Sequence, residues 1–248
     1  MLVSLATGQA IGASGSATFP YACKSVSKIF IKIDDDATAY NSYSVTVQLG
    51  SRTICNGASN WGLSIFGAMV GGQNPSDTES FLQLDLGMHQ LLDNENLYVT
   101  VRSSGNALTA VDVSALVDEN SGGEFPVRYT EYSDTTFTAE NVLKAVGYSS
   151  SAGAVDEATG NIEIRNAVSS SSPTLISASN WYGATVVQNW FATYGGLLVD
   201  SQVPLTTTFN YTSNATNRIL VASLMGTNQR AISQGRRQSA IARSQVGK

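Results

Sequence analysis

Charged side chains are scarce in this chain. Asp, Glu, Lys and Arg make up 13% of its 248 residues, which is about half the usual share in a soluble protein. Neutral polar residues and glycine take their place, while 42% hydrophobic residues exclude a disordered chain. A surface of neutral polar groups is typical of extracellular proteins, virion exteriors and subunits packed in an array. It is less typical of a nucleotide-binding enzyme.

Side chains that commonly perform catalysis or bind metals are also few. The single histidine, His89, lies in no pattern of a catalytic triad, and one histidine with two distant cysteines is a poor set of zinc ligands. The segment Gly12–Gly15 lacks the lysine of a phosphate-binding loop. The triplet Asp34–Asp36 lacks the spacing and glycine of an EF-hand, so it indicates a solvated turn more than a calcium site. We expect no enzymatic activity, no cofactor and a structural role for His89.

The cysteines and the hydrophobic runs carry little information. Cys23 and Cys55 do not define a disulfide framework and are expected to be buried thiols, with a Cys23–Cys55 disulfide as the alternative. No window approaches 18 uninterrupted apolar residues, so no membrane-spanning helix is predicted. Residues 1–17 lack the basic start and apolar run of a secretory signal, so synthesis in the cytoplasm is expected.

Charge is distributed unevenly between the body and the C-terminus. The net charge is −5, but residues 228–248 contain five basic residues and no acidic one, which leaves 9 basic against 19 acidic residues before them. This asymmetry predicts a partner for the tail, which is nucleic acid, an anionic membrane face or an acidic patch on a neighbouring subunit. The alternative is a solvated terminus. The candidate contact residues are Arg230, Arg236, Arg237, Arg243 and Lys248.

Short alternating segments separated by turn residues predict an all-β fold. In Val26–Ile33 and Tyr43–Leu49, apolar and polar residues alternate, as expected for strands that bury one face. Further strands are predicted at 52–55, 81–86, 97–101, 108–116, 126–132, 139–148, 161–168, 197–199, 203–211 and 218–225.

Two segments have the spacing of a helix instead. Trp61–Val70 presents one apolar stripe after a capping Ser59 or Asn60, and Trp181–Tyr194 follows a similar pattern. A glycine pair closes each segment, as is common at the C-terminus of a helix. One short helix is therefore predicted in each half of the chain.

A four-residue phrase occurs twice. Ala58–Trp61 returns as Ala178–Trp181, 120 positions later, and the chain has only three tryptophans. The flanking segments match in kind, since strands at 44–49 and 161–165 precede the two copies and β-rich runs at 97–101 and 218–222 follow them. The repeat is far longer than a solenoid unit of roughly 20–50 residues. It predicts two similar β domains joined in tandem.

The turn-forming residues Asn120–Gly123 mark the expected boundary. The small polar residues 1–21 are predicted as an N-terminal arm, 22–121 as the first domain, 122–227 as the second, and 228–248 as a basic tail. Short strands with at most one helix per half favour jelly rolls or sandwiches over an α/β fold. The predicted fold is therefore two tandem jelly-roll β-sandwiches, each with one short helix.

With its paired Ala-Ser-Asn-Trp segments, the Gly122-Gly123 junction and the basic tail, the chain resembles the double jelly-roll major capsid proteins of tailless icosahedral viruses. It looks like the small versions in bacteriophages with an internal membrane, over residues 22–227. The resemblance implies a homotrimer with six similar lobes that tiles the virion shell. It also implies contact with lattice neighbours, with other capsid proteins and, through the tail, with the internal membrane or the genome.

Other classes of protein remain open at the level of the sequence. A phage spike, an adhesin or a carbohydrate-binding sandwich would present an exposed aromatic face, although the helical spacing of Trp61 and Trp181 favours their burial. A single jelly-roll capsid protein is also compatible with the length. A β-sandwich hydrolase would need clustered carboxylates, and no pattern in the sequence indicates them.

Overall fold

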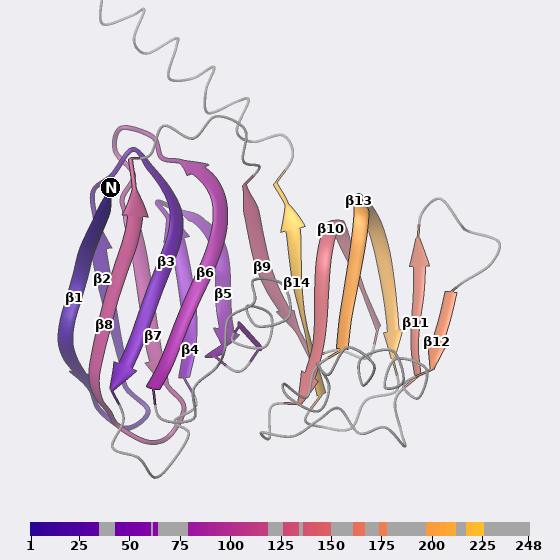
Figure 1. Cartoon of the computed structure of the whole chain (residues 1–248), viewed down its shortest axis with the longest axis horizontal. Coiled ribbons are helices and arrows are strands. Elements are labelled where there is room, and N and C mark those ends of the chain that lie inside the picture. The colour runs from indigo at the N-terminus through magenta and orange to yellow at the C-terminus, as the bar shows by residue number, and fades with distance from the viewer. Residues whose placement is uncertain are drawn as a thin grey trace, which may run out of the picture.

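The first eight strands form a two-layered sandwich (Figure 1). The computed structural model of the chain describes residues 1–34, 43–60, 62–63, 79–118, 126–133, 136–149, 161–166, 174–177, 197–211 and 217–225. The strands of the first half are β1 (Leu2–Ile11), β2 (Ser16–Tyr21), β3 (Ser25–Asp34), β4 (Tyr43–Leu49), β5 (Arg52–Ser59), β6 (Glu79–Gln90), β7 (Leu97–Ser103) and β8 (Leu108–Val117).

The order of these strands is that of a jelly roll. One sheet has the order β1-β8-β3-β6, and the facing sheet includes the run β5-β4-β7-β2. Of the strands that follow each other in the chain, only β4 and β5 pair, so every other connection crosses from one sheet to the other. This is the double Greek-key connectivity of an eight-stranded jelly roll.

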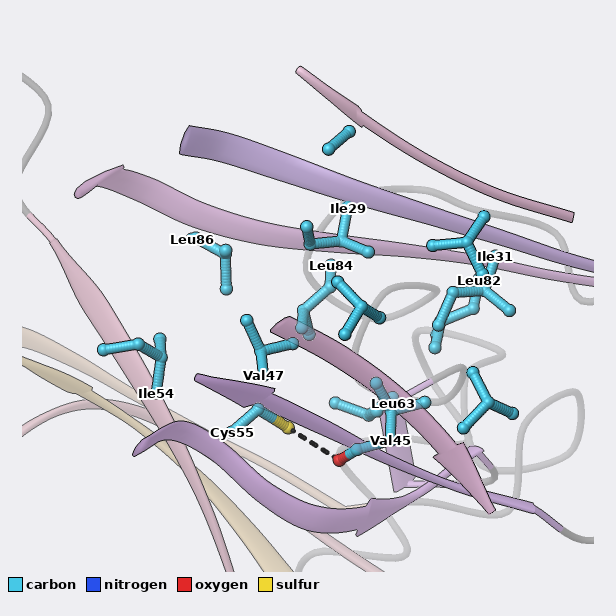
Figure 2. Close-up of a cluster of buried hydrophobic side chains, with 14 of the residues drawn as sticks. Ile29, Ile31, Val45, Val47, Ile54, Cys55, Leu63, Leu82, Leu84 and Leu86 are labelled. Carbon is cyan, nitrogen blue, oxygen red and sulfur yellow. Dashed lines mark hydrogen bonds between the residues drawn. The ribbon is translucent and has the colours of Figure 1, made fainter. Parts of the chain in front are cut away.

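Alternating side chains build the core between the two sheets. β4 alternates without exception between buried and half-buried residues, and Val45, Val47 and Leu49 are fully buried. Figure 2 shows Val45 and Val47 facing Ile29 and Ile31 of β3 and the leucines of β6 across the sandwich. Each fully buried side chain of this size contributes about 1.5–3 kcal/mol to the free energy of unfolding. The alternation predicted from Val26–Ile33 and Tyr43–Leu49 is confirmed.

Residues 1–21 differ from the prediction of an N-terminal arm, because they form β1 and β2. β1 pairs with β8 along the edge of one sheet, and β2 pairs with β7 along the edge of the other. Both strands are largely exposed, with only Ile11 and Phe19 buried. β2 alternates between exposed and more buried residues, a signal that its sequence offered, whereas β1 shows no regular alternation over its length.

The described strands of the second half repeat the pairings of the first. They are β9 (Val127–Tyr132), β10 (Thr136–Ser149), β11 (Asn161–Asn166), β12 (Thr174–Ser177), β13 (Leu197–Tyr211) and β14 (Asn217–Leu224). β9 pairs with β14 and β14 with the second part of β10, which pairs with the first part of β13. The first part of β10 pairs with the second part of β13, followed by β11 and β12.

These six pairings correspond one by one to those of the first half if β10 and β13 each count as two strands. The register slips in the middle of both strands, between Ala139 and Lys144 of β10. Asn141 has a positive φ of 51° there, and Pro204 of β13 has no N–H to donate to a ladder. In Figure 1, β13 rises, turns over near its label and descends again.

A pair of threonine hydroxyls marks the same place in both halves. Thr18 of β2 faces Thr100 of β7 with 2.8 Å between the hydroxyl oxygens, and Thr138 of β10 faces Thr208 of β13 at 3.0 Å. In each pair one threonine is exposed and the other half-buried. Thr18 and Thr138 are 120 positions apart, like the two copies of the four-residue phrase.

The repeat inferred from the sequence needs one correction. The β-rich runs Leu97–Val101 and Arg218–Ala222 were matched to each other, but they lie in β7 and β14, which have different pairing partners. By pairing, β14 corresponds to β8 and the second part of β13 to β7. The predicted strands at 197–199 and 203–211 are parts of one strand, β13.

The helix predictions fall mostly outside the described residues. Asn60, Gly62 and Leu63 are helical, and the buried Asn60 side chain accepts a hydrogen bond from the Tyr43 N–H at 3.1 Å. The rest of 61–70, the segment 181–194 and the boundary 120–123 lie outside the described part. No helix within that part is long and apolar enough to cross a membrane.

Gly50, in the turn between β4 and β5, tests the packing of one end of the sandwich. Its φ is +58°, and an added Cβ would lie 2.7 Å from Cγ of Glu95. Arg52 holds Glu95 in place through an ion pair of 2.7 Å between Nη2 and Oε2. We expect Gly50→Ala to cost about 1–2 kcal/mol for the backbone conformation and about 1–3 kcal/mol more for the clash, measured by denaturant unfolding.

Gly8→Ala is the matched control for this experiment. Gly8 has nearly the same φ, +60°, and no atom within 4 Å of an added Cβ. The loss of stability in Gly8→Ala therefore measures the cost of the positive-φ backbone conformation alone. Equal losses of stability in the two variants would contradict the predicted clash at Glu95.

Candidate functional site: the junction between the halves

The structure does not place the five basic residues predicted as a contact site. Arg230, Arg236, Arg237, Arg243 and Lys248 all lie outside the described residues. Their role remains a prediction. The candidate site that the described residues define is a different one, the junction between the first sandwich and the strands of the second half.

The cysteines supply no reactive centre in the described part. Cys23 and Cys55 are free thiols, so the alternative of a disulfide between them is wrong. Burial raises the pKa of Cys55 to about 12 and that of Cys23 to about 11, which keeps both thiols protonated at neutral pH and weakens them as nucleophiles. Asp34 ends β3. Among the described residues no group of three or more His, Cys, Asp or Glu side chains could hold a metal ion.

Strand β9 contacts both layers of the first sandwich. It forms a parallel bridge to β5, where Tyr129 lies opposite Cys55, and this bridge continues the sheet of the first half into the second. On the other layer, β9 is held by two hydrogen bonds that involve side chains. The Tyr129 hydroxyl donates to the Asp85 carbonyl at 2.6 Å, and His89 Nε2 lies 2.9 Å from the Val127 carbonyl oxygen. β9 therefore covers the side of the sandwich bounded by β5 and β6.

His89 is a buried, neutral histidine at this junction. Its side chain is 1% exposed. Because a carbonyl oxygen only accepts, Nε2 carries the proton and donates it to Val127. Burial lowers the pKa of His89 to about 4, the hydrogen bond to Val127 acts in the opposite direction, and the charge of Arg52 adds to the lowering. The expected structural role of His89 agrees with this geometry. Burial also raises the pKa of the Tyr129 hydroxyl, which keeps it a donor.

Strand β14 is buried on both faces. Ile219, Leu220, Val221 and Ala222 are each at most 3% exposed. Leu220 and Ala222 belong to the core cluster of the first sandwich, together with Tyr129, whereas Ile219 and Val221 are buried outside that cluster. One face of the sheet at β14 therefore packs on the first half, and the other faces a separate apolar environment.

These contacts give the junction a mechanical role more than a chemical one. An apolar face, two hydrogen bonds and a continuous sheet fix the second half against the first. Sequence reasoning identified the strands but missed the junction. The run Ile219-Leu-Val-Ala was the available signal, because an unbroken apolar run indicates a strand buried on both faces.

The protonation of His89 gives a testable dependence of stability on pH. The folded pKa of about 4 lies below the ordinary histidine value of 6.5, so the unfolded chain binds a proton that the folded chain excludes between these pH values. Stability therefore falls as the pH drops from 6.5 to about 4, by about 3 kcal/mol from this group. Denaturant unfolding at pH 7 and pH 4 measures the loss.

His89→Gln is the control, since its amide keeps an N–H donor and does not titrate in this range. The acidic groups common to both proteins cancel in the comparison. We expect the wild type to lose about 3 kcal/mol more than the variant between pH 7 and pH 4. An identical loss in both would show that His89 is protonated in the folded protein.

Comparison with solved structures finds a similar fold in the major capsid protein P2 of bacteriophage PM2. The TM-score is 0.55 at 8% sequence identity, over 92% of this chain and 98% of that chain. PNGF-II (TM-score 0.34, 9% identity, 91% and 62% covered) and an archaeal virus protein with a triple jelly-roll fold (0.28, 8%, 90% and 58%) are more distant, and their scores are too low to establish a shared fold. No family model and no curated protein matches the chain. The similarity to the PM2 protein is one of fold: the chain has an all-β jelly-roll fold of the kind found in a viral capsid protein.

Proposed function

We propose that the chain is a double jelly-roll major capsid protein, a structural subunit of a virion shell and not an enzyme. The repeated order of strand pairing supports two tandem jelly rolls: residues 127–224 use the same six pairings as residues 2–117. The PM2 capsid protein, which has a similar fold over nearly its whole length, supports the capsid role. In this proposal residues 228–248 form a separate basic tail.

The oligomer that we propose is a homotrimer. A tandem duplication gives three copies six similar lobes, so a trimer presents edges close to sixfold symmetry and can tile an icosahedral lattice. The junction supports this role, because lobes held rigidly by β9 and β14 present their edges at a fixed angle. The low share of charged residues, 13%, keeps the repulsion between neighbouring subunits small.

The solution mass of the purified protein tests this proposal. Light scattering coupled to size exclusion is expected to give three times 26.1 kDa, and negative-stain images are expected to show a six-lobed outline. A monodisperse monomer at all concentrations would contradict the capsid proposal and favour a binding module.

The basic tail is proposed to contact an anionic partner inside the particle, which is the internal membrane, the genome or a neighbouring subunit. Each basic residue near an anionic lipid surface contributes about 1 kcal/mol. Deletion of 228–248 is therefore expected to leave a folded trimer and to reduce particle assembly, measured as particle yield. Replacement of the five basic residues by glutamine separates the effect of charge from that of length. Normal yield from both variants would refute a role for the tail.

A further inference from the structure

The junction between the two halves of one chain joins a strand of each half. In the described part of the chain, the two strands that correspond to them make no such contact. Within the chain, the first strand of the second half, β9, lies against β5, which is the end strand of the first-half run β5-β4-β7-β2. The corresponding strands for a contact between chains are β1 and β12. In the described part of the chain both end their sheets, with one neighbouring strand each.

The registers align β1 with β9. Val111 and Val113 of β8 are buried and face inward, as do Ile219 and Val221 of β14. When these two pairs are treated as equivalent positions, Leu116 corresponds to Leu224. The spacing of 108 positions is also that between Thr100 and Thr208 of the neighbouring threonine pairs.

With β8 and β14 aligned, the first two contact positions of β1 and β9 coincide. Leu2 lies opposite Leu116 as Val127 lies opposite Leu224, and Ser4 lies opposite Ser114 as Tyr129 lies opposite Ala222. Leu2 and Ser4 thus occupy the places of the two β9 residues that hold the junction together.

The exposure of these positions differs between the two halves. Tyr129 is 4% exposed, and Val127 is half-buried against the first core. Leu2 is 63% exposed and Met1 62%, and these are two of the four large apolar side chains that the structure records as exposed in its described part. The apolar position that is half-buried at Val127 is open to solvent at Leu2.

The shape of β1 leaves only its beginning available for a contact. Register shifts interrupt its pairing with β8 from Ser4 to Ile11, and such bulges protect an edge strand from pairing with another chain. Leu2, Val3 and Ser4 pair in regular register. The intrachain contact of β9 is similarly short, with a single bridge to β5.

We propose that the start of β1 in one copy docks on the β12 edge of a second copy of this chain. The contact repeats between chains what β9 makes with β5 inside one chain. β1 and β12 lie at opposite ends of the molecule (Figure 1), so the contact is head-to-tail, and in the proposed trimer it closes a ring of three copies. The inference rests on the proposed trimer and names the surface that holds it together.

Leu2→Lys tests this surface, with Leu92→Lys as the matched control. Leu92 is also an exposed leucine, 41% exposed, but it lies in the turn after β6 and away from β1 and β12. A lysine blocks edge pairing and leaves the apolar position unfilled, so we expect Leu2→Lys to weaken association by ~10- to 100-fold. Leu92→Lys is expected to associate like the wild type. Sedimentation over a range of concentrations measures both.

The outcomes separate this proposal from the one on which it rests. A wild-type monomer contradicts both. A wild-type trimer that Leu2→Lys leaves intact, or that both variants weaken equally, overturns the β1–β12 contact and leaves the capsid proposal standing. Backbone hydrogen exchange of the wild type is the second measurement, should Leu2→Lys fail to fold. Slower exchange at residues 2–4 and 174–177 in the concentrated protein than in the dilute protein is expected, and equal exchange would overturn the proposal.

Discussion

An open side of a β-sandwich must be covered, and β9 meets that requirement in this chain. Two four-stranded layers leave backbone groups and apolar side chains exposed where β5 and β6 end the sheets. β9 bridges to β5 through its backbone and reaches β6 through Tyr129 and His89. The core of the first half therefore includes side chains from the second, among them Leu220 and Ala222.

This shared core makes the two halves one mechanical unit. A flexible linker would allow the halves to rotate independently, whereas a continuous sheet and the hydrogen bonds of Tyr129 and His89 fix their angle. His89 is suited to such a place because it is held neutral: a charged imidazole would carry an unpaired charge into an apolar junction. Rigidity of this kind serves a subunit whose edges must meet neighbours at constant angles.

The outer faces of the sheets fit the same role. On the face of β2, β7 and β4, the threonines Thr18, Thr100 and Thr46 lie side by side in register, and the Thr138–Thr208 pair continues this chemistry in the second half. Hydroxyl groups satisfy one another and water without the long-range repulsion of charges. These threonines place part of the neutral polar composition on the outer faces of the sheets.

Alternation along single strands was readable from the sequence, because a strand with one buried face requires a period of two whatever its partners are. Val26–Ile33 and Tyr43–Leu49 were found for that reason, and Ala58–Trp61 with its copy indicated a duplication. Which strands pair was not readable: Leu97–Val101 and Arg218–Ala222 have similar compositions and different partners, and the edge strand β1 buries too little to leave a regular pattern. The junction of His89, Tyr129 and Val127 was decided by the tertiary structure alone, because its contacts join residues distant in the chain whose local sequences carry no trace of one another.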